Sequence, residues 1–165
     1  NGNDKISGGA GIDFLWGEAG NDAIAGGTGN DTLVGGIGND TYTMARGWGS
    51  DRIVDIDTTA GNRDTLQFAA GVARDQLWFK INGSYLEIDV IGTGDRVLID
   101  GWTAGNDHRI ESIRTGGMET TDVGLMNLIN AMAAMTPPPP GPPGRTAAQH
   151  TQLDSVIAAS WHAAA

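Results

Sequence analysis

Residues 8–43 read GGAGIDFLW, GEAGNDAIA, GGTGNDTLV and GGIGNDTYT, four consecutive copies of one nine-residue pattern, and residues 1–7 (NGNDKIS) form a shortened copy before them. A glycine, an aspartate and an apolar residue each keep a fixed place in the pattern. Glycine recurs at Gly2, Gly11, Gly20, Gly29 and Gly38, aspartate at Asp4, Asp13, Asp22, Asp31 and Asp40, and the apolar residue at Ile6, Leu15, Ile24, Leu33 and Tyr42. Such a fixed period predicts a repeat architecture of stacked, similar units.

The residue types within one copy favour binding of a hard cation. Clustered glycines permit positive φ and close approach of the backbone, so that a turn can aim several carbonyl oxygens at one point. The aspartate adds a charged oxygen at that point. Calcium takes six to eight oxygen ligands in flexible geometry, whereas magnesium demands a near-ideal octahedron. The chain contains no cysteine and no clustered histidines, which argues against zinc or copper.

The last three residues of each copy are β-prone, with one apolar residue pointing inward. Two copies therefore make one coil of strand, turn, strand and turn, and turns on the same side lie two copies apart. This geometry predicts ions between Asp4 and Asp22, between Asp13 and Asp31, and between Asp22 and Asp40. It also predicts that Ile6, Ile24 and Tyr42 stack on one sheet while Leu15 and Leu33 stack on the other.

The pattern continues in degraded form beyond residue 43. Residues 46–54 (RGWGSDRIV) place Asp51 in phase, and residues 61–68 (GNRDTLQF) place Asp64 in phase. Asp51 is expected to pair with Asp31, and Asp64 with Asp40, for a total of about three to five calcium ions. The candidate ligands are the side chains of Asp4, Asp13, Asp22, Asp31, Asp40, Asp51 and Asp64 and the turn backbone at Gly8, Ala10, Gly11, Gly17, Ala19, Gly20, Gly26, Thr28, Gly29, Gly35, Ile37 and Gly38.

Net charge and hydropathy restrict the classes of partner and function that the chain can have. The formal net charge is −10, and much of it lies on carboxylates that the repeat brings face to face, so the calcium-free repeat is expected to be loose or unfolded. The acidic balance argues against nucleic acid as a partner. There is no apolar run long enough to span a membrane. The alternative, a flexible glycine- and aspartate-rich linker, does not account for five copies in phase.

The segment after the repeats is rich in strand signals. Residues 77–81 (LWFKI) precede Asn82-Gly83, a hairpin signal, and residues 85–91, 96–102 and 108–115 are further strand candidates. These strands are expected to be antiparallel and to cover the end of a parallel β-roll, which would otherwise promote aggregation. Trp48, Trp78 and Trp102 are expected in the core of this cap, whereas Trp16 points outward.

A helix is predicted over residues 124–135, capped by Thr121 or Asp122, with Val123, Met126, Ile129 and Met132 on one face. Residues 136–145 (TPPPPGPPGR) form a proline-rich spacer, for which a peptide-ligand role is the alternative. Residues 153–161 (LDSVIAASW) form an apolar segment, which is expected to be a short helix capped by Asp154 or Ser155. The expected organisation is therefore a mainly β chain: a calcium-binding roll at residues 1–68, a β-rich cap with a helix at residues 69–135, and a linker with a terminal segment at residues 136–165.

The repeat resembles the calcium-binding nonapeptide GGxGxDxUx of RTX, or hemolysin-type calcium-binding, proteins. Glu18 departs from it at a glycine position, and Ile12 replaces the usual asparagine. Residues 75–102, 108–112 and 124–134 resemble the region after the repeats in this family. The proline-rich spacer and residues 155–161 are similar to the C-terminal end of adenylate cyclase toxins.

The resemblance implies a right-handed parallel β-roll and export by a Gram-negative type I secretion system, through an uncleaved signal after about residue 106. The chain would pass unfolded through the transporter complex and fold on calcium outside the cell. Because the sequence begins inside a repeat, we expect a monomeric C-terminal piece of a toxin or exoenzyme, with membrane or host-receptor contacts made only by the parent protein.

The sequence leaves one alternative class of function open and argues against another. The alternative function is a calcium-dependent adhesin module, in which the roll or the cap would contact a receptor or a glycan. An enzyme is not expected, because His108, His150 and His162 lack a metal or triad spacing, and Ser155 and Ser160 lie in no nucleophile elbow.

Overall fold

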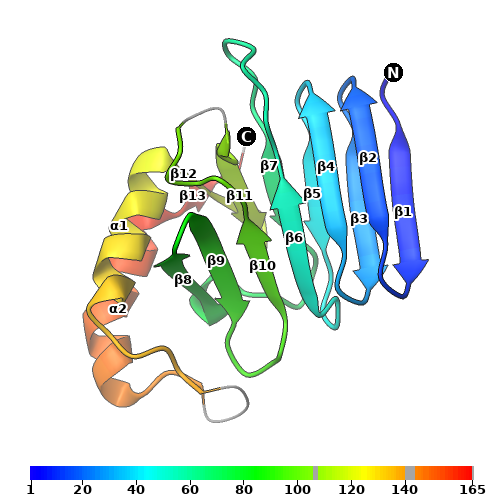
Figure 1. The fold of residues 1–165 in the computed structure, drawn as a ribbon. Helices are drawn as coiled ribbons and strands as arrows, with labels where there is room; N and C mark the ends of the chain where they lie inside the picture. Colours follow the sequence, from blue (N-terminus) through cyan, green and yellow to red (C-terminus); the bar gives the residue numbers. More distant parts are fainter. Residues whose placement is uncertain (106–107, 140–143, 165) are drawn as a thin grey trace.

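The computed structural model describes residues 1–105, 108–139 and 144–164. Its strands form two sheets that lie one against the other (Figure 1). The first sheet has the order β1 (Lys5–Ala10), β3 (Ala23–Thr28), β5 (Thr41–Met44), β7 (Thr65–Phe68), β11 (Ser112–Thr115), β12 (Met118–Thr121) and β13 (His162–Ala163). The second has the order β2 (Phe14–Ala19), β4 (Thr32–Ile37), β6 (Ser50–Val54), β10 (Arg96–Ile99), β9 (Tyr85–Val90) and β8 (Leu77–Asn82).

The repeats form a parallel β-roll, as their period predicts. Successive strands alternate between the two sheets, so β1 pairs in parallel with β3 and β2 pairs in parallel with β4. The predicted inward residues stack in register, Ile6, Ile24 and Tyr42 on one sheet and Leu15 and Leu33 on the other. Leu66 extends the first stack, and Ile53 and Ile99 extend the second. The two stacks meet in a thin core, because β1 to β4 each contribute one large inward side chain.

The strands after the repeats continue both sheets. β10 pairs in parallel with β6, and β11 pairs in parallel with β7. Only the next strands outward, β9 and β8 in one sheet and β12 and β13 in the other, pair antiparallel. The prediction of a purely antiparallel cap was therefore wrong at β10 and β11. Each of these two strands pairs with the last strand of one sheet of the roll and continues its parallel order.

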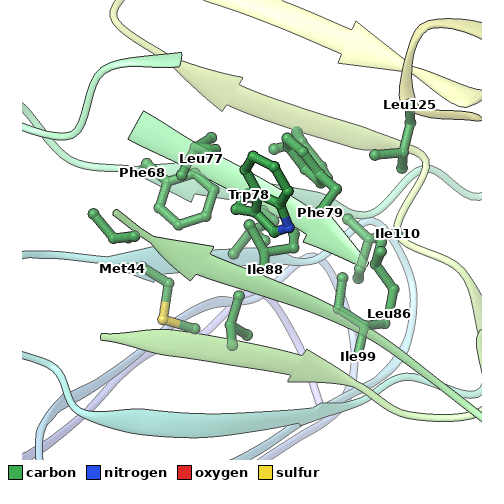
Figure 2. Close-up of a cluster of buried hydrophobic side chains, with 14 of the residues drawn as sticks. Met44, Phe68, Leu77, Trp78, Phe79, Leu86, Ile88, Ile99, Ile110 and Leu125 are labelled. Atoms are coloured by element: carbon green, nitrogen blue, oxygen red, sulfur yellow. The ribbon is translucent and has the colours of Figure 1, made fainter. Parts of the chain in front are cut away.

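Many large buried side chains gather where the last strands of the roll meet the cap (Figure 2). Trp48, Trp78 and Trp102 are buried there, as expected, whereas Trp16 is exposed. Trp48 packs against Phe68, with ring centroids 5.7 Å apart, and its indole N–H donates to the carbonyl oxygen of Arg96. Aromatic side chains thus join the last coil of the roll to the cap.

Two helices cover the end of the sheets opposite β1 (Figure 1). Helix α1 (Asp122–Ala133) begins after Thr121, whose side chain makes no capping hydrogen bond. Its buried face consists of Leu125, Leu128, Ile129 and Met132. The expected face was wrong at Val123 and Met126, which are exposed, because α1 packs against α2 and β8 with the face that carries Leu125 and Leu128.

The terminal segment is also helical, but it begins earlier than predicted. Helix α2 (Ala147–Ser160) is capped by Thr146, which accepts a hydrogen bond from the backbone N–H of Gln149. Asp154 and Ser155, the predicted caps, lie inside this helix. A 3-10 turn, η1 (Arg74–Gln76), precedes β8, and the part of the proline-rich spacer at residues 140–143 lies outside the described residues. Among the described residues, no helix is long and apolar enough to cross a membrane.

Candidate metal sites along the turns

The turns of the roll form two rows, one along each edge of the stacked sheets. The first turn row carries Asp13, Asp31 and Asp51, and the second turn row carries Asp4, Asp22, Asp40 and Asp64. Within each row, a hydrogen bond joins every pair of neighbouring aspartates. The structure thus brings together the three pairs read from the perfect repeats and the two pairs inferred for Asp51 and Asp64.

These hydrogen bonds use only one oxygen of each carboxylate. The backbone N–H of Asp4 donates to Oδ1 of Asp22 at 2.7 Å, and the N–H of Asp22 donates to Oδ1 of Asp40 at 2.8 Å. The same bond recurs at the longer turns, where the N–H of Asp31 donates to Oδ1 of Asp51 at 2.9 Å. From Asp22 onward, each aspartate of the two rows therefore holds the preceding turn with one oxygen and keeps the other for a different partner.

Among the seven aspartates of the two turn rows, the second carboxylate oxygen is buried and has no hydrogen-bond partner in five, namely Asp13, Asp22, Asp31, Asp40 and Asp51. Buried polar atoms are nearly always paired, and a buried charge without a partner is far more costly than a neutral group. The same atom is orphaned in consecutive turns, so its position belongs to the repeat. A bound cation is the partner that this geometry suits.

Glycine keeps the space beside this oxygen open. A Cβ atom added to Gly8 would lie 2.5 Å from Oδ2 of Asp13 and 2.6 Å from the carbonyl oxygen of Gly26 in the next coil. A Cβ atom added to Gly17 would lie 2.6 Å from the carbonyl oxygen of Gly35 and would also collide with Asp22. A carboxylate oxygen and a carbonyl oxygen from neighbouring coils therefore converge on the same small space.

The remaining predicted backbone positions lie where the strands enter the turns. The carbonyl oxygens of Ala19, Thr28 and Ile37 each accept a backbone N–H from the preceding coil, at 2.7 to 2.8 Å. A Cβ atom on Gly20, Gly29 or Gly38 would collide with the carbonyl of the glycine one coil earlier. Gly11 and Ala10 lie at the corresponding place in the first coil. These positions hold the coils in contact beside the aspartates.

The asparagines of the repeats have a role that the sequence analysis missed. Asn3 accepts a hydrogen bond from the backbone N–H of Asn21 at 2.8 Å, and Asn21 accepts one from Asn39 at 2.9 Å. Asparagine thus holds the following turn, whereas aspartate holds the preceding one. The signal was present as an asparagine before most of the aspartates. Ile12 departs from it, and its side chain is exposed.

Glu18 departs from the repeat in side chain but not in backbone. It has φ of 76°, a left-handed conformation that glycine adopts more easily, and it aligns with Gly36 in the neighbouring strand. The departure is accommodated because the side chain points to solvent and pairs with the amino group of Asn1 at 3.2 Å.

Burial, together with the charges of neighbouring carboxylates, raises the pKa of several groups. Burial, with the charges of Asp31 and Asp95, raises the pKa of Asp51 to about 6. Burial and the charges around it raise the pKa of Asp64 to about 7. Burial, with the charges of Asp64 and Asp40, raises the pKa of Asp55 to about 9. A cation among these groups opposes every one of these shifts, because it favours the ionised carboxylates.

A comparison with known families agrees with this geometry. A family model described as the RTX calcium-binding nonapeptide repeat matches residues 1–33 and 20–43, in four copies. The matched residues cover β1 to β5 and the turns between them. The chain therefore carries RTX repeats, a type of repeat that binds calcium.

Proposed function

We propose that this chain, which carries RTX calcium-binding repeats, is a module that is loose or unfolded at low calcium and folds when calcium fills its turns. The observation that supports this most directly is the buried, unpartnered carboxylate oxygen that recurs in five turns. Without cations these carboxylates oppose the fold. With cations the same groups become ligands.

The expected size of the effect is enough for a folding switch. Extracellular calcium modules bind with Kd values of roughly 10⁻⁴ to 10⁻³ M. A ligand at ten times its Kd stabilises the folded state by roughly 1.4 kcal/mol per site, so four or five sites add about 6–7 kcal/mol. That sum is comparable with the whole stability of a domain. At submicromolar calcium the contribution falls almost to zero.

Such a switch suits a protein that is exported unfolded. In this proposal the chain stays export-competent in the calcium-poor cytosol, passes through a type I secretion apparatus, and folds as a monomer outside the cell. The signal lies in the C-terminal segment after about residue 106, a position that itself lies outside the described residues. Folding of the roll would then support an upstream passenger, a toxin or an exoenzyme.

The folding part of the proposal is tested by far-UV circular dichroism of the whole chain during a calcium titration. We expect β structure to increase cooperatively at roughly 10⁻⁴ to 10⁻³ M calcium. Magnesium at equal concentration is the control and should leave the spectrum unchanged. A chain that is already fully folded in a calcium chelator would refute the switch.

The export part needs a separate experiment. A reporter fused upstream of the whole chain is expressed with a type I exporter, beside a matched fusion that ends at residue 105. Export of the first fusion alone supports a signal in the terminal segment. Equal export, or none from either fusion, rejects that assignment.

A second candidate function is calcium-dependent adhesion. It is favoured by an apolar groove on the outer face of the second sheet, where Trp16, Val34 and Val54 lie side by side across β2, β4 and β6. Phe14 and Trp16 are both exposed, with ring centroids 6.5 Å apart. A glycan array probed with the calcium-loaded chain tests this function, and Trp16→Ala should abolish any signal.

A further inference from the structure

The second turn row ends with a residue that breaks the repeat. Trp16 pairs with Val34 across β2 and β4, and Val34 pairs with Val54 across β4 and β6. The residues that follow these are Gly17, Gly35 and Asp55. Asp55 therefore stands in the place where the preceding coils have the glycine that keeps the ion space open. At this position the earlier coils have no side chain, whereas Asp55 has a carboxylate.

The side chain of Asp55 is enclosed among other carboxylates. Asp55 is 1% exposed, and both of its carboxylate oxygens are buried without a hydrogen-bond partner. Asp40, Asp55 and Asp64 each offer one oxygen, and these three atoms lie within 4.8 Å of one another. All three residues are buried. Three carboxylates at this separation match the ligand set of a hard cation.

A tyrosine points into the same space and gives an independent indication. Tyr42 is fully buried, and its hydroxyl group has no hydrogen-bond partner. A Cβ atom added to Gly35 would collide with both this hydroxyl group and Oδ2 of Asp40. The phenol oxygen and the carboxylates thus border one space. A buried hydroxyl group without a partner is costly, and a bound ion with its water would supply one.

The neighbouring Asp57 shows that burial in this turn does not by itself leave a carboxylate unpartnered. Its Oδ2 accepts the backbone N–H of Gly38 at 2.9 Å, and its Oδ1 accepts that of Thr59 at 2.7 Å. Asp55 and Asp57 therefore have different roles within the same turn.

We propose that Asp40, Asp55 and Asp64 hold a calcium ion in a carboxylate-rich site at the end of the second turn row, with the Tyr42 hydroxyl group beside it. Asp55 supplies the ligand that a glycine turn supplies elsewhere in the roll. Asp55 and Asp64 both lie beyond the residues matched by the repeat family. The inference rests on the proposed function, because Asp40 and Asp64 continue the row of aspartates.

Calcium is favoured over other cations by the donor set. The described ligands are all oxygens, which disfavours zinc and copper, and the long turn between Asp55 and Asp64 suits a flexible coordination shell. Ligand charge is one of the factors that set calcium affinity. Three carboxylates converge here, so this site should fill before the others.

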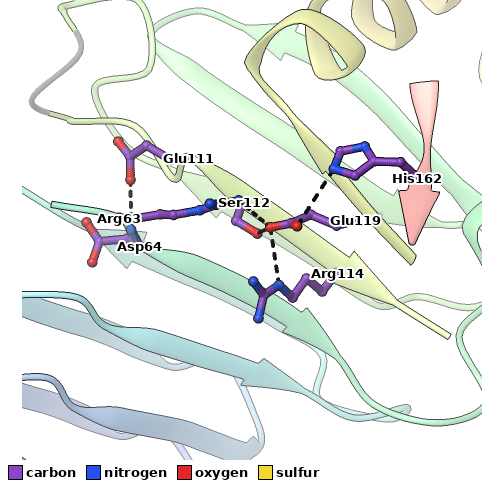
Figure 3. A network of polar contacts seen from close by, with 7 residues as sticks. All are labelled: Arg63, Asp64, Glu111, Ser112, Arg114, Glu119 and His162. Atoms are coloured by element: carbon purple, nitrogen blue, oxygen red, sulfur yellow. Dashed lines mark hydrogen bonds and ion pairs between the residues drawn. The ribbon is translucent and has the colours of Figure 1, made fainter. Parts of the chain in front are cut away.

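The site also connects the roll to the cap. The backbone N–H of Asp64 donates to Oε2 of Glu111 at 2.8 Å (Figure 3). Glu111 thus accepts the hydrogen bond that the next aspartate accepts elsewhere in the turn row. Glu111 directly precedes β11, the cap strand that pairs with β7. An ion that fixes Asp64 therefore also fixes the place where the cap joins the roll.

The test is a calcium titration of the whole chain by isothermal calorimetry, with ions counted by native mass spectrometry. We expect one ion to bind about ten-fold more tightly than the rest. Asp55→Asn should remove this tight ion, whereas the matched variant Asp57→Asn should retain it. Circular dichroism at saturating calcium checks that both variants fold.

The outcomes separate this inference from the proposed function. If the parent chain binds several ions and Asp55→Asn leaves the titration unchanged, the inference is wrong and the repeat sites stand. If the parent chain binds no calcium, both fail. If Asp55→Asn does not fold, crystals of the parent chain grown with calcium decide the matter. An ion in contact with the Asp55 carboxylate supports the inference, and its absence there overturns it.

Discussion

At the scale of single residues, each repeat divides the two oxygens of one carboxylate between two tasks. Oδ1 of Asp31 accepts the backbone N–H of Asp13 at 2.9 Å, while Oδ2 is buried without a hydrogen-bond partner. The first oxygen sets the spacing between coils, and the second is available to a cation. An amide in place of this carboxylate keeps the first task and loses the second, because one of its two terminal atoms is a donor.

The variant Asp31→Asn should therefore separate stacking from metal binding. In saturating calcium we expect a loss of roughly 1.4 kcal/mol or more of stability, the contribution of one site at ten times its Kd. In a chelator the sign should reverse, because one of several facing charges has been removed. Thermal unfolding with and without calcium measures both effects. Asp75→Asn, an exposed residue outside the turns, removes the same charge and should show neither.

Glycine at the first repeat position can be tested by sterics alone. Gly26 does not have positive φ, so alanine is compatible with its backbone, but the new Cβ would collide with Oδ2 of Asp31. We expect Gly26→Ala to lose about one ion's stabilisation, roughly 1.4 kcal/mol. The calcium midpoint by circular dichroism should rise accordingly. Gly94→Ala is the matched control, because a Cβ there meets nothing within 4 Å. An unchanged midpoint in Gly26→Ala would show that the ion lies elsewhere.

At the scale of elements, one buried glutamate joins strands that are distant in the sequence. Glu119 in β12 accepts a hydrogen bond from Arg63 at 2.6 Å and another from Ser112 in β11 (Figure 3). Arg114 lies 3.2 Å from the same carboxylate, and His162 in β13 lies 3.8 Å from it. The last long turn of the roll, the cap and the C-terminal strand thus meet at a single carboxylate.

This network should give the fold a component of acid sensitivity. Although burial raises the pKa of Glu119, the hydrogen bond from Ser112 and the charges of Arg114 and Arg63 bring it below 4.5. Its contribution to stability is therefore present above about pH 4.5 and is lost as the pH falls through the folded-state pKa.

We expect Glu119→Gln to lose about 1–3 kcal/mol at neutral pH, because its charged partners keep a weaker acceptor. Its stability should also fall less steeply than that of the parent chain on acidification. Urea unfolding between pH 3 and 7 in saturating calcium measures this. Glu18→Gln, an exposed residue, is the control and should follow the parent curve. If the stability of the parent chain, Glu119→Gln and Glu18→Gln falls equally steeply on acidification, Glu119 is not a source of the acid sensitivity.

The elements differ in how far the sequence predicts them. The phase of glycine and aspartate was enough to place the coils and to find Asp51 and Asp64 across two lengthened turns. Asp55 was missed because its role depends on strand register, which the insertions conceal. The face of α1 was misassigned at Val123 and Met126, since the contacts with α2 and β8 decide between neighbouring helical stripes. The start of α2 was signalled by Thr146 and Gln149, a capping box that was overlooked.

At the scale of the whole molecule, stability is divided unevenly along the stack. The cap buries large side chains such as Trp78, Phe79 and Leu86, and two helices cover it (Figures 1 and 2). The first coils bury little, and in β1 every side chain is exposed or only partly buried. They also bring unpaired carboxylates together. The hydrophobic effect therefore supports one end of the stack, while the other end depends on its ions.

Calcium removal should consequently loosen the molecule from the β1 end. We expect hydrogen–deuterium exchange in a chelator to show loss of amide protection in β1 to β4, whereas β8, β9 and α1 retain more of theirs. The physical reason is that a repeat stack is held by nearest-neighbour contacts, so its coils can open in sequence from a weak end. Saturating calcium should restore protection along the whole roll. Equal loss of protection in roll and cap would instead mean that the continuous sheets make the two parts a single cooperative unit, and that calcium in the turns stabilises the cap as strongly as it stabilises the coils.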